Sequence, residues 1–222
     1  LMEGRVEAVC YKRELPNYGV FDEKRVFSAG RDFQPMEFLG VKLGVMICED
    51  MWCDRVSMGL AEAGADIFVV LNGSPFDVQK KSARLDYARA RTEEAGLDLI
   101  YVNLVGGQDE LVFDGDSFVM GRKGVLAQRA CSWQDSLLKT NWKLTKNKWC
   151  CQNQDEIEHV DQIEEIYKAI TLGLRDYVNK NGFPGVLIGL SGGIDSALSA
   201  AVAVDAIGPE RVHCVMMPSP YT

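Results

Sequence analysis

The sequence contains no apolar run long enough to cross a membrane. Its longest apolar runs, around residues 67–71 and 186–190, are far shorter than the roughly 20 residues that a bilayer requires. Basic residues are in deficit, because 24 lysines and arginines face 32 acidic residues and give a formal net charge of −8. This balance disfavours binding of nucleic acid by the whole surface. We therefore expect neither a membrane nor a nucleic acid as a partner.

The seven cysteines include no CxxC pair and follow no regular spacing. A zinc or disulfide framework is therefore not predicted. Several of them lie in apolar runs, as reduced thiols do in cytosolic proteins. The first five residues also lack the basic-then-apolar pattern of a secretion signal. The sequence predicts a cytoplasmic protein.

The composition is that of a folded protein, with 47% hydrophobic and 25% charged residues. Three short apolar runs, at 41–48, 66–71 and 97–103, are predicted to be buried strands. Amphipathic patterns at 54–63 and 77–95, each followed by a glycine, predict helices between these strands. The later spacing of glycines indicates antiparallel hairpins. The first part of the chain is therefore expected to be α/β with a sheet that is not purely parallel.

A second unit follows a polar stretch that has neither a helical nor a strand period. Apolar residues three and four apart then predict one long helix from Asp155 to just before Gly182. A strand at 186–190, a Gly-Ser turn, a helix at about 195–207 and a second strand at 212–217 complete a βαβ unit. Two strands make a small sheet, so we expect a fragment that joins parts of two domains. The predicted divisions are a domain at 1–135, a linker at 136–154 and a second domain at 155–222.

The turn of the βαβ unit has the sequence LSGGIDS, at residues 190–196. Its two glycines let the backbone expose successive N–H groups, and the following helix adds partial positive charge, so a phosphate can bind there. Asp195 suits this place when a divalent metal bridges it to the phosphate, which predicts Mg²⁺. The alternative is a structural turn in which Asp195 caps the helix. The spacing matches neither the Walker A pattern nor the dinucleotide-binding pattern.

The SGGIDS turn after a strand resembles the signature of ATP pyrophosphatases, which split ATP into AMP and pyrophosphate while they adenylate a substrate. The resemblance implies the start of a doubly wound parallel-sheet domain with ATP as a substrate. It also implies that Asp195 holds the metal. The ATP-binding residues implied are Gly189, Leu190, Ser191, Gly192, Gly193, Ile194, Asp195 and Ser196.

Cys48 ends the first apolar strand and is followed by the residues Glu-Asp-Met-Trp. Such a cysteine is either a small buried hydrophobic residue or a nucleophile, and a thiolate nucleophile needs a nearby cation to lower its pKa. Lys12, expected to emerge from another strand, is the candidate cation; the alternative is a surface lysine. The residue types alone leave both choices open.

The segments YKRELPNYGVFDE at 11–23 and ICEDMW at 47–52 resemble the nitrilase, or carbon-nitrogen hydrolase, superfamily, which uses a Glu-Lys-Cys triad. The resemblance implies a nitrilase-like αββα sandwich, of which this chain holds the C-terminal part. It implies that Cys48 attacks a carboxamide carbon and that Lys12 stabilises the oxyanion. The family's glutamate comes from an earlier strand and is expected before residue 1.

One family combines both motifs. Over essentially its whole length the chain resembles the glutamine-dependent NAD synthetases, on the segments YVN at 101–103, GGQDELVFDG at 106–115 and MPS at 217–219. The resemblance implies that the first domain hydrolyses glutamine through a cysteine thioester. The ammonia then amidates ATP-adenylated deamido-NAD in the second domain and yields NAD, AMP and pyrophosphate. A homo-oligomer is also implied.

The same resemblance implies that glutamine contacts Tyr18, Ser74 and Lys80. Lys81 is an alternative to Lys80 after a one-residue slip, and both are alternatively exposed helix lysines. Arg84, one turn later, is expected to support the same wall.

Two other functions are kept as alternatives. One is a stand-alone carbon-nitrogen hydrolase that needs no ATP, which the turn at Ser191 disfavours. The other is a non-catalytic nucleotide-binding module, which the activity of the full-length protein would decide.

Overall fold

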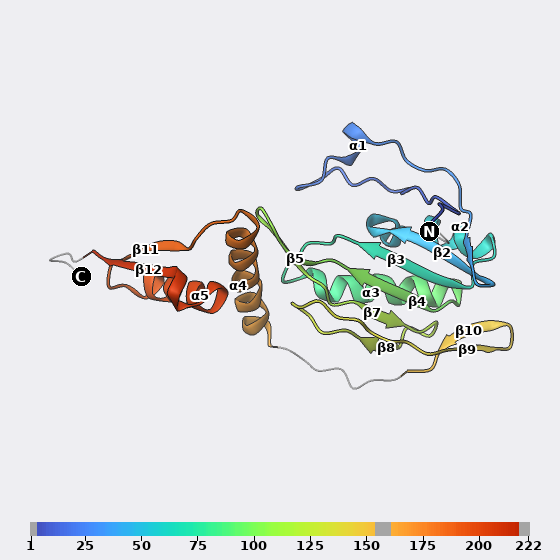
Figure 1. Cartoon of the computed structure of the whole chain (residues 1–222). Helices are drawn as coiled ribbons and strands as arrows, with labels where there is room; N and C mark the ends of the chain where they lie inside the picture. The colour runs from blue at the N-terminus through green and yellow to red at the C-terminus, as the bar shows by residue number, and fades with distance from the viewer. Residues whose placement is uncertain (1–3, 154–160, 218–222) are drawn as a thin grey trace.

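A six-stranded mixed sheet forms the centre of the N-terminal unit in the computed structural model, which describes residues 4–153 and 161–217 (Figure 1). Its strands, in spatial order, are β1 (Met36–Phe38), β2 (Val41–Ile47), β3 (Ile67–Asn72), β4 (Leu99–Asn103), β7 (Phe118–Met120) and β8 (Leu126–Arg129). The neighbours β2, β3 and β4 are parallel, whereas β1, β7 and β8 pair antiparallel. The three predicted strands and the mixed sheet are confirmed.

Two helices, α2 (Asp54–Glu62) and α3 (Lys80–Ala95), connect the three parallel strands. Both were predicted from their apolar periodicity. Helix α3 ends at Gly96, which has φ +65° and donates its N–H to the Thr92 carbonyl at 2.9 Å, as a left-handed C-cap does. It begins three residues later than predicted, because the Asp77 carboxylate accepts the Gln79 N–H at 2.9 Å and forms a turn there.

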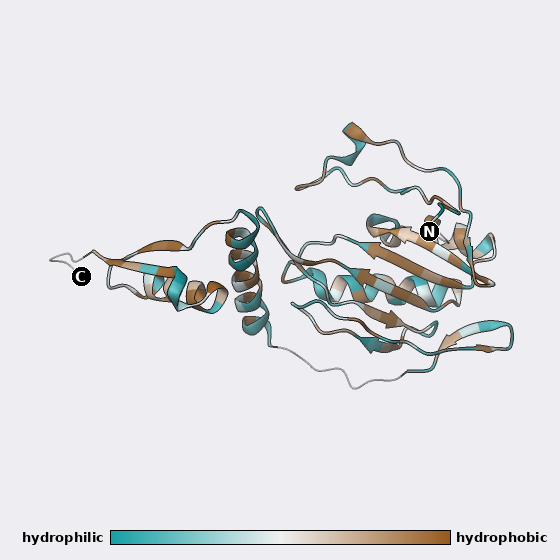
Figure 2. Ribbon diagram, in the orientation of Figure 1, coloured by the Kyte–Doolittle hydropathy of each residue, from teal (hydrophilic) through white to brown (hydrophobic). Residues whose placement is uncertain are grey.

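The main core lies between these helices and one face of the sheet, where the strands are hydrophobic (Figure 2). The expectation that the strands are buried throughout is wrong, since Leu71 and Val102 on the other face are 48% and 43% exposed. Successive side chains of a strand point to opposite faces, and the helical layer covers only one of the two faces. The buried members of the core are Met46, Met51, Val56, Leu60, Ala65, Phe68, Val70, Ala88, Leu97, Leu99, Tyr101, Phe118 and Met120.

Two hairpins extend from this unit. The first consists of β5 (Val105–Gln108) and β6 (Leu111–Asp114), as the glycine spacing predicted. The second, β9 (Trp142–Thr145) and β10 (Lys148–Cys151), forms where the sequence showed no period. Its two turn residues, 146 and 147, have φ of 50° and 60°, which suits a two-residue hairpin turn. The divisions at 1–135, 136–154 and 155–222 stay a prediction.

Residues 4–35 run outside the sheet and contain only the short helix α1 (Glu23–Val26) (Figure 1). The expectation that Lys12 emerges from a strand is wrong, because the segment around it pairs with no strand of the described sheets. Its backbone is held by isolated contacts, such as the Gly30 N–H donating to the Lys12 carbonyl at 2.8 Å. The position of Lys12 is therefore determined by tertiary contacts and not by strand pairing.

The C-terminal unit consists of α4 (Gln162–Lys180), β11 (Val186–Leu190), α5 (Ile194–Ile207), the 3₁₀ turn η2 (Pro209–Arg211) and β12 (Val212–Met216). The two strands are parallel, so the predicted βαβ unit is confirmed. Asp161 caps α4 by accepting the Ile163 N–H at 2.9 Å. The predicted helix start at Asp155 lies outside the described residues.

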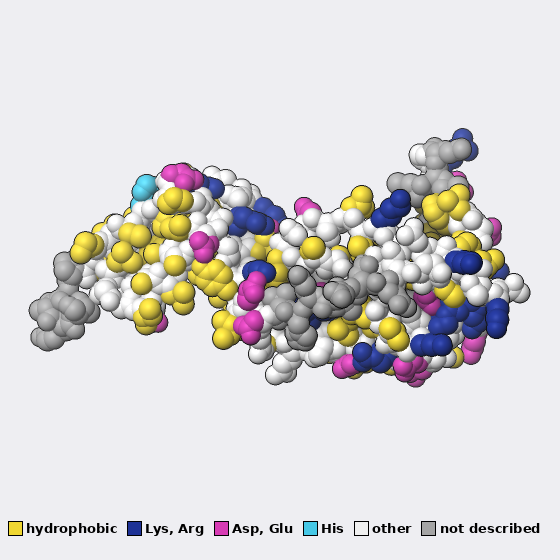
Figure 3. All heavy atoms as spheres, turned by 90° about the horizontal axis from the view of Figure 1, so that it is seen from below, with side chains coloured by type: hydrophobic (Ala, Val, Ile, Leu, Met, Phe, Trp, Pro, Cys, Tyr) yellow, Lys and Arg dark blue, Asp and Glu magenta, His cyan; other side chains and the backbone are white. Residues whose placement is uncertain are grey.

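Helix α4 stands between the two units (Figure 1). It packs against β5 and β6 of the N-terminal unit on one side and against α5 on the other. Hydrophobic side chains gather on the surface of the C-terminal unit (Figure 3), and the most exposed are Ile163, Ile194 and Met216. Within the described ranges, no helix combines the length and apolar character needed to span a membrane.

Candidate active sites

Cys48 lies at the first residue after β2 and opens the short 3₁₀ turn η1 (Cys48–Trp52). Its φ of 49° falls in the left-handed region that residues other than glycine rarely adopt. Such a backbone conformation persists only where the surrounding contacts hold it. The thiol is therefore presented from a tightly held turn at a strand end, as the sequence predicted.

The buried carboxylate of Asp50 forms several of the contacts that hold the backbone around Cys48. Its Oδ1 accepts the backbone N–H groups of Arg13 at 2.9 Å and Glu14 at 2.7 Å, and its Oδ2 accepts the Ile47 N–H at 3.0 Å. One side chain thus ties the segment that follows Lys12 to the turn that carries the cysteine. The sequence interpretation gave Asp50 no role, although an acidic residue just after a strand end was a usable signal.

Lys12 has a fixed anionic partner in Glu23, the first residue of α1. Its Nζ lies 2.6 and 2.7 Å from the two carboxylate oxygens, and both side chains are mostly buried. This pair anchors the ammonium group in a segment that lacks regular structure. The sequence interpretation missed Glu23, because its partner is eleven residues away and no helical or strand period relates the two.

Burial raises the pKa of the Cys48 thiol above its ordinary value. The nearby charges of Lys12 and Lys80 lower this pKa, and those of Glu49 and Glu23 raise it. Lys12 thus acts in the predicted direction, but burial outweighs it. The resting thiol is therefore protonated near neutral pH, and attack on a carbonyl requires a group that accepts its proton.

Tyr18, Lys80 and Glu49 surround the cysteine. The Tyr18 hydroxyl donates to Glu49 Oε2 at 2.8 Å, and burial and this hydrogen bond raise the tyrosine pKa. The Tyr18 ring meets Phe21 edge-on with centroids 6.1 Å apart, and Lys80 Nζ lies 5.9 Å from the centroid of Phe21. Tyr18 and Lys80, two of the predicted glutamine-binding residues, thus both lie next to Phe21. Glu49 and Phe21 were missed as individual contacts.

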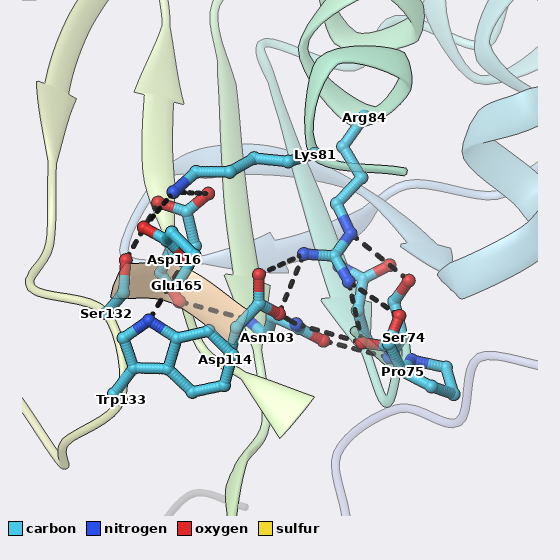
Figure 4. A network of polar contacts seen from close by, with 12 residues as sticks. Ser74, Pro75, Lys81, Arg84, Asn103, Asp114, Asp116, Ser132, Trp133 and Glu165 are labelled. Atoms are coloured by element: carbon cyan, nitrogen blue, oxygen red, sulfur yellow. Dashed lines mark hydrogen bonds and ion pairs between the residues drawn. The ribbon is translucent and has the colours of Figure 1, made fainter. Parts of the chain in front are cut away.

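Ser74 is buried and held by a polar network (Figure 4). Its N–H donates to Asn103 Oδ1 at 2.9 Å. Arg84 donates to Ser74 Oγ at 3.3 Å and to the Ser74 carbonyl at 2.8 Å, so the predicted support from Arg84 is confirmed as a contact. Burial raises the pKa of the neighbouring Tyr101, and Arg84 and Ser74 lower it.

The two candidate lysines at the start of α3 point to different partners. The charge of Lys80 lowers the pKa of Cys48, and its ammonium group lies near the ring of Phe21. Lys81 instead forms an ion pair with Glu165 of α4, with Nζ and Oε1 2.7 Å apart. This arrangement favours Lys80 over Lys81 as the predicted glutamine contact.

The turn between β11 and α5 forms the second candidate site. Gly192 has φ +87°, and α5 begins after Gly193 without a side-chain cap. The hydroxyls of Ser191 and Ser196 lie 3.3 Å apart, and the Ser191 N–H points to the latter at 3.4 Å. The turn is exposed, so its N–H groups and hydroxyls can receive an anion at a helix start.

The donor set here suits a metal that arrives with a nucleotide. No group of three or more His, Cys, Asp or Glu residues capable of holding a metal occurs in the part of the chain that the structure describes. Asp195, in the first turn of α5, would supply one carboxylate ligand. Mg²⁺ usually takes one or two carboxylates together with substrate phosphates, so this residue fits that pattern.

The sequence pattern of the carbon-nitrogen hydrolases matches residues 2–145, which is more than half of the chain. The chain belongs to the carbon-nitrogen hydrolase family. The pattern of the NAD synthases matches residues 166–222. The predicted α/β fold, a nitrilase-like hydrolase unit followed by the start of an NAD synthase unit, is thereby confirmed.

Curated relatives match both units of this carbon-nitrogen hydrolase. The glutamine-dependent NAD(+) synthetases of Acinetobacter baylyi and Rhodobacter capsulatus are 42% and 44% identical over the whole chain, which covers 41% and 40% of their lengths. The solved glutamine-dependent NAD+ synthetase from Acinetobacter baumannii, in complex with ADP, is 44% identical with a TM-score of 0.93 and covers 100% of this chain, which spans 42% of that one. The chain therefore spans about two fifths of the length of the curated relatives it matches.

Proposed function

We propose that this chain is part of a glutamine-dependent NAD synthetase. The observation that carries the proposal is the likeness to such enzymes across both units, with a hydrolase site in one and a phosphate-type turn in the other. In this proposal the protein is cytoplasmic and homo-oligomeric, and its substrates are glutamine, ATP and deamido-NAD.

In the first half-reaction, the Cys48 sulfur attacks the carboxamide carbon of glutamine. The thiol proton passes to a base, a role that the family resemblance gives to the triad glutamate. Lys12, held by Glu23, stabilises the negative charge on the carboxamide oxygen as the tetrahedral intermediate forms. The base returns this proton to the amide nitrogen, the C–N bond breaks and ammonia leaves, and water then hydrolyses the thioester to glutamate and the free thiol. Tyr18, Ser74 and Lys80 hold the substrate.

In the second half-reaction, the turn at residues 190–196 holds the pyrophosphate end of ATP. Asp195 would hold Mg²⁺, which supplies neutralising charge at the phosphates. Deamido-NAD attacks the α-phosphate and becomes adenylated while pyrophosphate leaves, and ammonia then displaces AMP to give NAD. Ammonia in water is largely protonated near neutral pH and is then no nucleophile, so transfer through a dry passage preserves its reactivity.

Glutamine labelled with ¹⁵N at the amide tests this function in the full-length protein. With ATP, Mg²⁺ and deamido-NAD present, we expect the label in the carboxamide of NAD, with AMP and pyrophosphate formed in equal amounts. Ammonia release from glutamine that is the same with and without ATP, with no NAD formed, would instead indicate a stand-alone carbon-nitrogen hydrolase. Nucleotide binding without either reaction would indicate a non-catalytic module.

A further inference from the structure

Glu165 is a buried carboxylate on α4 that reaches into the hydrolase unit (Figure 4). Its side chain is 6% exposed. Oε1 lies 2.7 Å from Lys81 Nζ, and Oε2 accepts the indole N–H of Trp133 at 3.1 Å. A buried charge is costly unless it is paired and hydrogen-bonded, so these two partners fix where the carboxylate sits.

The first partner leads to one side of the proposed glutamine site. Lys81 is the second residue of α3 and follows Lys80 directly. Besides Glu165, its ammonium group faces Asp116 at 4.0 Å, but Asp116 is already paired with Arg129 through two contacts of 2.5 and 2.6 Å. Glu165 is therefore the main anionic partner of Lys81 at the start of α3.

The second partner leads to the other side of the same site. Trp133 packs edge-on against Phe76 with ring centroids 4.9 Å apart, and Phe76 follows Ser74 by two residues. The backbone N–H of Trp133 donates to the backbone carbonyl of Asp114 at 2.9 Å. The carboxylate of Asp114 in turn pairs with Arg84. Glu165 thus contacts the start of α3 directly, and it reaches the segment that carries Ser74 through Trp133 and Phe76.

We propose that Glu165 is a positioning residue for glutamine hydrolysis: from the synthetase unit it sets the positions of Lys80 and Ser74. The inference rests on the proposed function, because it assumes that these two residues bind glutamine. In consequence, the glutamine site is complete only when α4 is docked.

A separate contact keeps α4 docked when Glu165 is altered. The Gly107 N–H donates to Asp176 Oδ2 at 2.8 Å, and Lys180 donates to the Gly107 carbonyl at 2.6 Å. A side chain at Gly107 would meet the Gly173 Cα at 3.0 Å, so the two backbones approach closely. A variant at Glu165 therefore tests positioning rather than docking.

The test compares Glu165→Gln with the matched control Glu164→Gln in the full-length protein. Glu164 pairs with Lys168 on the exposed side of α4, with 2.6 Å between the charged atoms. Glu165→Gln keeps the shape and an acceptor for Trp133 but removes the charge that holds Lys81. We expect its KM for glutamine to rise about five- to tenfold with kcat little changed. Ammonia-driven NAD synthesis should stay unchanged.

Two further variants separate positioning from a general loss of structure. Lys81→Met should reproduce the KM rise, whereas Lys81→Arg, which keeps the charge, should stay within about twofold of wild type. Equal KM values in Glu165→Gln and Glu164→Gln would overturn the inference. So would a parallel fall of glutamine- and ammonia-driven synthesis, which marks a structural role. A wild-type protein that does not hydrolyse glutamine would overturn the proposed function itself.

Discussion

Replacement of Arg84 by methionine should separate the stability of the hydrolase unit from its affinity for glutamine. The buried guanidinium donates to the Ser74 hydroxyl and carbonyl, to the Pro75 carbonyl and to both oxygens of Asp114, the last two at 2.8 Å (Figure 4). Methionine fills much of the same volume but donates nothing. Ser74 would then lose its main support, and Asp114 would lose its counter-charge.

The expected destabilisation is about 3–5 kcal/mol, the range for removal of one partner from a buried ion pair. Asp114 is fully buried and would keep a single side-chain donor, Asn103 Nδ2 at 3.2 Å. Burial already raises the pKa of Asp114, and Arg84 opposes that rise. In the variant this pKa rises further, so the proton stays bound in the folded state. The loss of stability should therefore be smaller near about pH 5 than at about pH 8.

The assay is urea-induced unfolding of the full-length protein at both pH values, with glutamine KM measured on the same preparations. The double variant Arg84→Met with Asp114→Asn leaves neither charge of this buried pair, so about 1–3 kcal/mol of stability should return. The glutamine KM should stay raised, because Ser74 has still lost the two hydrogen bonds that Arg84 donates.

Arg89→Met, on the exposed side of the same helix, is the control and should change stability by less than about 0.5 kcal/mol. A loss below about 1 kcal/mol in Arg84→Met would refute the reasoning from the buried ion pair. A double variant that regains both stability and KM would show that Arg84 does not position Ser74.

Four further predictions follow from the two sites. Lys12→Met should lower kcat for glutamine hydrolysis on the order of a hundredfold or more, and a change confined to KM would contradict an oxyanion role. Alkylation of Cys48 by iodoacetamide, followed by peptide mass spectrometry, should be slower at pH 8 than that of glutathione and should still rise above pH 9, because burial raises the thiol pKa. Gly193→Val should block NAD synthesis from either nitrogen source and spare glutamine hydrolysis. The added Cβ would lie 3.6 Å from Ser191 Oγ, an ordinary contact distance, so the variant should fold. If calorimetry finds ATP binding unchanged in this variant, the turn is not the phosphate site. Asp195→Ala should weaken ATP binding more with Mg²⁺ than without it, whereas equal losses would mark Asp195 as a structural cap.

The elements that local patterns describe could be predicted from the sequence. Strand β11 has the predicted bounds of 186–190, and α2 and α5 differ from the prediction by one residue at an end. Each has an apolar period and a turn or capping residue at its end, which depend only on neighbours in the chain. The placement of Cys48 at a strand end followed in the same way.

The contacts that assemble the site could not be predicted, because they join residues that no period relates. Asp50 is more than thirty residues from Arg13 and Glu14 in the sequence, and Glu165 is 84 residues from Lys81. A carboxylate in the sequence carries no sign of its partner. The family resemblance predicted residues for substrate contact and one supporting residue, Arg84, but it did not predict Glu23, which holds Lys12 in place.

The central claim, that Cys48 serves the glutamine reaction and the turn near Ser191 serves ATP, is tested most directly by Cys48→Ala in the full-length protein. NAD formation from deamido-NAD and ATP is measured with glutamine and, separately, with ammonium chloride as the nitrogen source. We predict that the variant makes no NAD from glutamine and retains wild-type synthesis from ammonia. Continued glutamine-driven synthesis, or loss of both activities in a folded variant, would contradict the account.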